Sequence, residues 1–279
     1  MTSEEIGTLA LEAMLLEVSV TPKPGLVDRN NSGAHRDMGF FTFMKSAAGL
    51  RSSFEDFAEA GIVGGVKKFL PHEIFPYIRK IGIEAEKRMF SATGGINTHK
   101  GEIFSLGLLS ACSGYLSGSG RKVKAGDVMK TAAEMCRGIC ERDFAEVKTK
   151  SPESLTKGER VYIEHGITGI RGEAEDGYPA VRNISLPALK KYLDDGFSMN
   201  DAMAMTLIHI MAHAQDTNII SRHDILTAQE VMINAKKMIS SGFGLDDIKR
   251  LDDDFISKWI SPGGSGDLLA VTYFLYALS

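Results

Sequence analysis

The chain has 279 residues, of which 43% are hydrophobic and 24% are charged, as is usual for a globular protein. Its formal net charge of −4 argues against bulk attraction to nucleic acid or to an anionic membrane surface, and no apolar run is long enough to span a bilayer. The N-terminus lacks the pattern of a secretory signal. The three cysteines of the chain form no C-x-x-C pair. We therefore expect a cytoplasmic protein with reduced thiols.

Helical periodicity dominates the first half of the chain. Thr2 and Glu5 have the spacing of a capping box, and the helix that they begin should end near Val18, where a proline-rich segment follows. A later helix should close near Gly94-Gly95. Apolar stripes predict helices over residues 40–50, 74–89, 102–116 and 128–139.

Between residues 148 and 183 the helical pattern breaks up, and we expect at most a short helix around Val161. Helices then resume, one of them with Asp224 as its N-cap and Gly242 as its stop. There is no alternating strand pattern, internal repeat or low-complexity linker, so residues 1–279 are predicted to form a single all-α domain. The later predicted helices cover residues 186–193, 201–214, 225–239, 245–260 and 266–278.

Four polar segments interrupt the helical pattern, and the first covers residues 21–37. Pro22 and Pro24 fix two backbone angles and remove two amide donors, so this segment should be stiff and non-helical. A dense set of polar side chains follows, with only Leu26 and Val27 able to anchor it in an interior. The segment suits ligand binding, although a polar surface loop would have a similar composition.

The second segment, residues 93–102, ends one predicted helix and begins the next. Backbone amides at that helix start, together with His99 and Lys100, would suit a phosphate group. A glycine-rich turn capped by Thr98 would look the same.

The third segment, residues 169–178, carries Arg171 followed by Glu173 and Glu175. Carboxylates two residues apart on an extended or turning chain can share a metal ion or divide acid and base roles. An exposed acidic loop is the alternative. The fourth segment, residues 216–222, follows a predicted helix; its Asp and Asn would either ligate Mg²⁺ or hold a ribose, or simply cap the next turn.

Two other patterns are weaker. His209 and His213 have the spacing of zinc ligands on a helix, but Ile210 replaces the Glu of H-E-x-x-H and the neighbours are apolar. Residues 262–266 resemble a phosphate-binding loop but lack the G-K-[ST] of a Walker A motif.

Together the segments resemble the triphosphoribosyl-dephospho-CoA synthase family, in order and over nearly the whole chain. The resemblance depends on T-P-K-P-G-L-V-D-R-x-x-x-G-A-H-x-D at 21–37, N-T-H-K-G at 97–101, G-I-R-G-E-A-E at 169–175, D-T-N at 216–218 and the tail at 261–270. One departure is that His223-Asp224 stand where the family often has paired glycines.

The resemblance implies a helical transferase that joins ATP to dephospho-coenzyme A. The 2′-hydroxyl of the dephospho-CoA ribose would attack C1′ of the ATP ribose, and adenine would leave. The product would be the precursor of the prosthetic group of the citrate lyase acyl carrier protein, attached by a further transferase. A related branch would serve malonate decarboxylase. These partners are small molecules and a downstream enzyme; the resemblance leaves an oligomer open.

The residues fit such chemistry, because a triphosphate needs Mg²⁺ and cations, while the attacking hydroxyl must lose a proton and the leaving adenine must gain one. We assign proton transfer to Asp28, Asp37, Glu102 and Glu175 and Mg²⁺ binding to Glu173 and Asp216, although the sequence leaves this division open. The predicted substrate-binding residues are Lys23, Arg29, Asn31, His35, Arg36, Asn97, His99, Lys100, Arg171, Asn218 and Arg222. The four segments should meet at one cleft.

Two other functions use many of the same residues. One is a metal-dependent hydrolase of a nucleotide or ADP-ribose-like ligand, with water as the nucleophile. The other is a non-catalytic nucleotide-binding regulator. Adenine release that requires dephospho-CoA favours the transferase, release without it favours the hydrolase, and binding without turnover favours the regulator.

Overall fold

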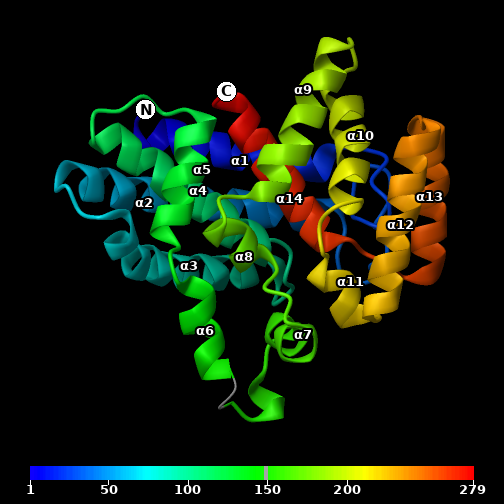
Figure 1. Cartoon of the computed structure of the whole chain (residues 1–279), viewed down its shortest axis with the longest axis horizontal. Helices are drawn as coiled ribbons and strands as arrows, with labels where there is room; N and C mark the ends of the chain where they lie inside the picture. Colours follow the sequence, from blue (N-terminus) through cyan, green and yellow to red (C-terminus); the bar gives the residue numbers. More distant parts are fainter. Residues whose placement is uncertain (148–149) are drawn as a thin grey trace. The chain divides into compact units, whose positions relative to one another are not determined.

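The structure is a computed structural model that describes residues 1–147 and 150–279. Over those residues the chain is helical and contains no strand, which confirms the predicted all-α class (Figure 1). Within the same residues, no helix combines the length and the apolar character needed to cross a bilayer. The chain divides into two compact units, each built from separate stretches: unit 1 comprises residues 1–19, 36–137 and 270–279, and unit 2 comprises residues 20–35 and 138–269. A single domain over residues 1–279 stays a prediction.

Unit 1 is organised around α2, which contacts α1, α3 and α4. The predicted capping box at the start of α1 is confirmed, because the amide of Thr2 donates to Glu5 Oε2 at 2.9 Å and the amide of Glu5 donates to Thr2 Oγ1 at 3.1 Å. The helices of unit 1 are α1 (Ser3–Ser19), α2 (Phe40–Val66), α3 (Pro71–Thr93), α4 (Lys100–Gly118), α5 (Ala125–Met135) and the last turns of α14 (Gly263–Ala277).

Small residues bring α2 and α4 into backbone contact. A Cβ atom added at Gly61 would lie 2.0 Å from the carbonyl oxygen of Ala111, and one added at Gly114 would lie 2.1 Å from that of Ala58. Real Cβ atoms do not approach backbone oxygens so closely, so only glycine permits this helix spacing.

Unit 2 is organised around α10, which contacts α9, α12, α13 and the π-helix. Nearly all of α10 is buried, including its run from Ala202 to Ile208. The helices of unit 2 are α6 (Ile139–Val147), α7 (Lys157–His165), α8 (Ile170–Glu175), a π-helix (Val181–Ser185), α9 (Leu186–Asp194), α10 (Met199–Met211), α11 (Thr217–Arg222), α12 (Ile225–Ser241), α13 (Leu245–Lys258) and the first turns of α14; a 3₁₀ turn covers Pro152–Ser154.

Some predicted boundaries were wrong. The stripe predicted as one helix over 128–139 is split, because α5 ends at Met135 and Gly138, with φ of 71°, turns the chain before α6 begins at Ile139. The helix predicted over 40–50 continues to Val66 as α2.

The stretch 148–183 holds more helix than the single short one expected, although residues 148 and 149 lie outside the described residues. It contains α7, α8 and the π-helix. The Thr156–Glu159 capping box begins α7 and Gly166, in the left-handed conformation, ends it. These are short helices whose local end signals outweigh a weak apolar stripe.

Candidate functional site

Segment 20–35 of unit 2 is a loop that folds around its own aspartate. The Asp28 carboxylate is 1% exposed and accepts four hydrogen bonds. Its Oδ1 accepts hydrogen bonds from the amides of Asn30 at 2.7 Å and Asn31 at 2.9 Å. Its Oδ2 accepts hydrogen bonds from the hydroxyl of Thr21 at 2.7 Å and the amide of Lys23 at 3.3 Å. Asp28 therefore shapes the loop, and its predicted role in proton transfer stays a prediction.

Two side chains from distant helices hold this loop, and the sequence analysis missed both. Asn200 of α10 accepts the amide of Thr21 at 3.0 Å and returns a hydrogen bond to the Thr21 carbonyl at 2.8 Å. Asp252 of α13 accepts the amide of Gly25 at 2.9 Å and Asn31 Nδ2 at 2.8 Å.

A sequence signal for Asp252 did exist. It lies four residues after Ile248 and three before Phe255, so helical spacing places a carboxylate on the buried face of α13. A buried acid on an apolar stripe has to be compensated by donors. Burial raises the pKa of Asp252, and the donors Gly25 and Asn31 oppose that rise.

The cations of the loop differ in exposure. Lys23 is 1% exposed, whereas Arg29 is exposed and its Nη2 donates to Asn200 Oδ1 at 2.9 Å. Arg36 and Asp37, both exposed, belong to unit 1 in the structure. Arg29 is thus a surface guanidinium whose direction is set by a second residue.

Segment 216–222 forms α11, with Asp216 as its N-cap. Asp216 Oδ1 accepts the amides of Asn218 and Ile219, and Oδ2 accepts both the amide and the hydroxyl of Ser265, at 2.8 and 2.9 Å. Burial raises the pKa of Asp216 despite these four donors. A cation would have to displace them, so the contacts favour an anchoring role over the predicted metal ligation.

Arg222, at the end of α11, joins this segment to the loop. Its Nη2 donates to the carbonyl of Ala34 at 2.8 Å, and its Nη1 lies 3.4 Å from His35 Nε2. The same ring nitrogen lies 2.9 Å from the hydroxyl of Ser261, which precedes α14. A Cβ atom at Gly169 would lie 3.1 Å from Thr217 Cγ2. Segments 21–35, 169–178 and 216–222 therefore meet within unit 2, joined by the 261–265 tail.

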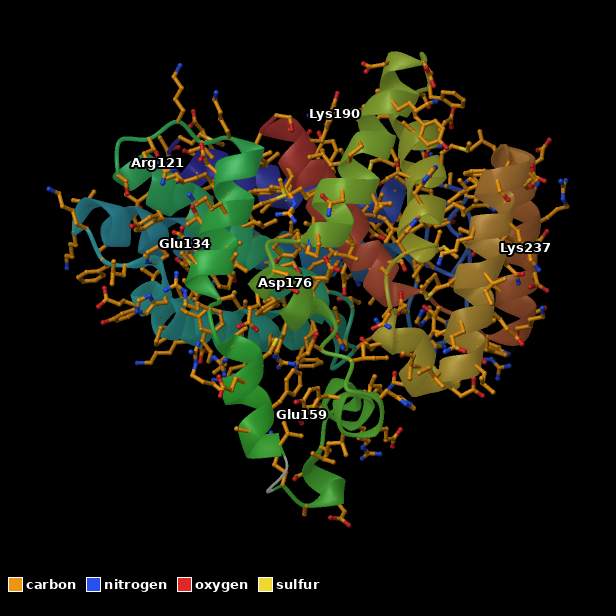
Figure 2. All side chains as sticks on the ribbon, in the orientation of Figure 1. Arg121, Glu134, Glu159, Asp176, Lys190 and Lys237 are labelled. Atoms are coloured by element: carbon orange, nitrogen blue, oxygen red, sulfur yellow. The ribbon has the colours of Figure 1, made fainter. Side chains whose placement is uncertain are left out.

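Glu173 and Glu175 both lie on the helix α8, not on an extended or turning chain on which neighbouring carboxylates could share a metal ion, and their assigned roles stay predictions. Two residues of a helix are about 200° apart around its axis, so the two carboxylates diverge. Glu173 accepts the amide of Ala180 at 3.2 Å, and burial raises its pKa. Glu175 accepts the amides of Gly138 and Cys140, at 2.5 and 3.1 Å, at the start of α6. Asp176, the next residue and labelled in Figure 2, is exposed.

Arg171 is also held in place. Its Nε lies 3.1 Å from Asp143 Oδ2, and its guanidinium carbon lies 5.8 Å from the centre of the Phe144 ring. That ring stacks on Tyr162 of α7 with centroids 3.7 Å apart. The side chain of Arg171 remains 38% exposed, so it is oriented by its neighbours while part of it faces solvent.

Segment 93–102 lies in unit 1, between α3 and α4. His99 is fully buried, with Nδ1 2.8 Å from the hydroxyl of Ser46, which also receives Thr98 Oγ1 at 2.8 Å. Glu102 is 2% exposed. His99 and Glu102 thus contribute to the interior of unit 1, and the predicted contact of His99 with a phosphate stays a prediction.

Lys100 is the exposed cation of this segment. Its side chain is half exposed and pairs with Glu86 at 2.9 Å, and its amide is capped by Asn97 Oδ1 at 3.3 Å. An anion at this helix start would meet a positive side chain, the α4 amides and the helix dipole together.

The residues named as possible metal ligands do not form a ready-made cation site. Within residues 1–147 and 150–279 no three His, Cys, Asp or Glu side chains are grouped so that they could hold a metal ion. His209 Nε2 lies 2.9 Å from the Tyr192 hydroxyl, and His213 Nδ1 lies 2.9 Å from the His209 carbonyl.

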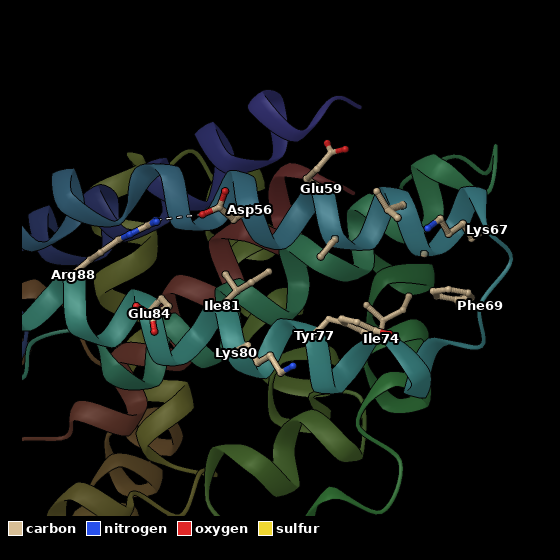
Figure 3. Close-up of a pocket in the computed structure, with 13 residues that line it drawn as sticks. Asp56, Glu59, Lys67, Phe69, Ile74, Tyr77, Lys80, Ile81, Glu84 and Arg88 are labelled. Atoms are coloured by element: carbon tan, nitrogen blue, oxygen red, sulfur yellow. Dashed lines mark hydrogen bonds and ion pairs between the residues drawn. The ribbon is translucent and has the colours of Figure 1, made fainter.

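A groove of about 640 Å³ lies between α2 and α3 of unit 1 (Figure 3). Apolar side chains including Ile74, Tyr77 and Ile81 line it, and the Arg88–Asp56 ion pair, at 3.3 Å, crosses one end. None of the predicted site residues lines it.

Comparison with known proteins supports the resemblance read from the motifs. The family model CitG, ATP:dephospho-CoA triphosphoribosyl transferase, matches residues 3–279. A 2-(5″-triphosphoribosyl)-3′-dephosphocoenzyme-A synthase of Klebsiella pneumoniae is 37% identical over 282 aligned positions, covering 99% of this chain and 92% of that protein. A relative from Vibrio cholerae, named as a probable synthase of the same kind, is 40% identical, covering 98% of this chain and 88% of its own.

A solved structure agrees with the fold. A crystal structure from Archaeoglobus fulgidus, named for triphosphoribosyl-dephospho-CoA synthase, has a TM-score of 0.50 and 17% sequence identity, and covers 84% of this chain and 98% of its own. At that identity it speaks for the fold alone. The family match, in contrast, spans both units, and the relatives align along nearly their whole length. The chain therefore belongs to the CitG family of ATP:dephospho-CoA triphosphoribosyl transferases.

Proposed function

We propose that this protein joins ATP to 3′-dephospho-CoA to give 2′-(5″-triphosphoribosyl)-3′-dephospho-CoA and adenine. The observation that carries the proposal is the family match over residues 3–279, which includes all four polar segments. Relatives named for this synthase activity, at 37 to 40% identity over nearly the whole chain, support it.

At C1′ the reaction makes one bond and breaks one, and two proton transfers accompany this exchange. The 2′-oxygen of dephospho-CoA bonds to C1′ of the ATP ribose while the bond from C1′ to the adenine nitrogen breaks. The hydroxyl proton goes to a base, and adenine takes up a proton as it leaves. Developing positive charge at C1′ is stabilised by a nearby carboxylate.

Positive side chains of the polar segments suit the triphosphate. Arg29 is exposed and oriented by Asn200, and Arg222 is anchored to the carbonyl of Ala34. Guanidinium groups held in this way bind phosphate with less loss of side-chain entropy than mobile ones. We assign the triphosphate to these two arginines, with Lys100 and Arg171 as further candidates.

We propose that Mg²⁺ enters as part of the Mg²⁺–ATP substrate. A triphosphate carries about four negative charges, and Mg²⁺ typically binds through phosphates, waters and one or two carboxylates. Of the two predicted ligands, Glu173 is the better candidate. The amide of Ala180 donates to its Oε2, whereas four donors surround the carboxylate of Asp216. Titration of Mg²⁺–ATP into Glu173→Ala should show weaker binding; unchanged affinity would remove Glu173 from the metal site.

The decisive experiment measures adenine. Purified protein is incubated with Mg²⁺–ATP, with and without dephospho-CoA, and adenine and the coupled product are quantified by chromatography and mass spectrometry. Adenine release that depends on dephospho-CoA supports the transferase. Release without it would point to a hydrolase, and binding without release would point to a regulator.

We propose that the product passes to a transferase that attaches it to the acyl carrier protein of citrate lyase, in the cytoplasm. Reduced thiols at Cys112, Cys136 and Cys140 suit that compartment. Malonate decarboxylase is the alternative recipient. Offering the purified product to each apo-carrier with its own transferase, and following the mass of both carriers, distinguishes the two.

A further inference from the structure

The amide group of Asn31 is engaged on both sides within unit 2. Its Oδ1 accepts the amide of Gly33 at 2.6 Å, and its Nδ2 donates to Asp252 Oδ2 at 2.8 Å. The second oxygen of Asp252 accepts the amide of Gly25 at 2.9 Å. Asn31 and Asp252, which are 221 residues apart, therefore tie both arms of the loop to α13.

We propose that Asn31 and Asp252 are a positioning pair that holds the loop carrying Arg29 in its binding geometry, and that Asn31 does not itself contact substrate. The inference rests on the proposed function for its catalytic readout. Three observations support it: both polar atoms of the Asn31 side-chain amide are engaged by groups of the protein, Asp252 is 3% exposed, and the loop folds back on itself where the amide of Ala34 donates to the carbonyl of Gly25 at 3.0 Å.

The donor and acceptor pattern makes the pair testable by exchange. In Asp252→Asn, the new side chain needs its oxygen to accept from the amide of Gly25, so its nitrogen faces the amide nitrogen of Asn31 and two donors meet. Rotating the Asn31 side-chain amide by 180° would remove that clash but would set its nitrogen against the amide of Gly33. Asn31→Asp places two carboxylates against each other. The double variant, which combines Asn31→Asp with Asp252→Asn, restores every hydrogen bond. Its new amide on α13 would donate to the new carboxylate of the loop while still accepting from Gly25, and that carboxylate would still accept from Gly33.

Kinetics are measured with Mg²⁺–ATP and dephospho-CoA well below the melting temperature of every variant. Each single variant should lower kcat/KM for ATP roughly 10- to 100-fold, as expected for one buried hydrogen bond to a charged group. The double variant should recover to within a few-fold of wild type. Asp253→Asn is the matched control, because it makes the same charge change on an exposed residue of the same helix and should leave activity unchanged.

Hydrogen exchange at the amides of Gly25 and Gly33 is followed in parallel, since it needs no turnover. Both amides should exchange faster in each single variant and return to wild-type protection in the double variant. Restored protection without restored activity would show that Asn31 touches substrate and would overturn the proposal, as would single variants with wild-type kcat/KM. If wild type releases no adenine, the proposed function fails, and exchange alone then decides: unchanged protection in the single variants overturns the pair.

Discussion

At the scale of single residues, Lys100 is an exposed cation of segment 93–102 in unit 1. Its surface ion pair with Glu86 contributes little to stability, so the side chain is available for an anion. We expect Lys100→Ala to weaken nucleotide binding by about 1.5–3 kcal/mol, the value of a charge-assisted contact to phosphate. Lys87→Ala is the matched control, since Lys87 is exposed and forms a similar surface pair with Glu84. If calorimetry gives the same nucleotide affinity for wild type and Lys100→Ala, Lys100 does not bind the nucleotide and belongs to a surface turn.

Cys140 illustrates how a neighbour sets reactivity. Burial, together with the hydrogen bond and the charge of Glu175, raises the pKa of its thiol to about 12. A group with a raised pKa stays protonated, so at pH 8 the thiolate should be roughly 1,000-fold scarcer than for an ordinary cysteine, and alkylation correspondingly slower. Mass spectrometry of the Cys140 peptide after timed exposure to iodoacetamide measures this rate. Alkylation as fast as that of a free cysteine would contradict the assigned environment.

Glu175 has the opposite shift. Burial alone would raise its pKa, but the thiol and amide of Cys140 and the amide of Gly138 outweigh burial and lower it. The charged carboxylate is therefore the stable form at neutral pH, and it faces the start of α6. Glu175 is better placed to hold α6 than to accept a proton from a substrate.

At the scale of elements, the α2–α4 contact depends on glycine. Gly114→Ala would bring a methyl group to within 2.1 Å of the carbonyl oxygen of Ala58, so the two helices must separate. The protein should therefore lose about 1–3 kcal/mol of unfolding free energy. Gly126→Ala on α5 is the control, because its Cβ meets nothing within 4 Å and alanine favours helix by at most about 1 kcal/mol. The midpoint of urea unfolding should therefore fall in Gly114→Ala and rise slightly in Gly126→Ala. A Gly114→Ala protein as stable as wild type would contradict this packing.

Two N-caps of unit 2 differ in what they hold. Asp224 is exposed and accepts a hydrogen bond from the amide of Thr227 at 2.7 Å, so Asp224→Ala should lower the unfolding free energy only slightly. Asp216 is buried and also holds Ser265, so Asp216→Ala should cost about 2–4 kcal/mol through loss of the cap and of buried hydrogen bonds. The denaturant midpoints of the two variants measure this difference in stability. Equal losses of unfolding free energy would contradict the anchoring role of Asp216.

At the scale of the whole molecule, we expect a single displacement with inversion at C1′. ATP is a β-glycoside, so a single displacement should give a product with an α-glycosidic link at C1′. A retaining route would need a nucleophilic carboxylate with a second carboxyl about 5–5.5 Å away. Glu173 and Glu175, the closest pair in sequence, diverge on α8. Incubation with Mg²⁺–ATP alone should give no adduct; a triphosphoribose mass on an Asp or Glu that proceeds to product would overturn single displacement.

The sequence by itself determined the helical class, the capping box of α1, the N-cap of α12 at Asp224 and the family, because these depend on local spacing and on contiguous motifs. Helix spacing could also have revealed Asp252, since a carboxylate on the face shared by Ile248 and Phe255 is anomalous. The sequence also placed the polar segments between helices but not the roles of their residues.

Only the tertiary structure decided those roles. Asp28, Glu175 and Asp216 look alike as motif carboxylates, yet each is surrounded by donors from its own loop, from α6 or from the start of α14. Asn200 and Asp252 lie 179 and 227 residues from the loop positions that they hold. A carboxylate's role depends on which donors the fold brings to it, and contacts over such separations follow from the packing of whole helices, which a local pattern does not encode.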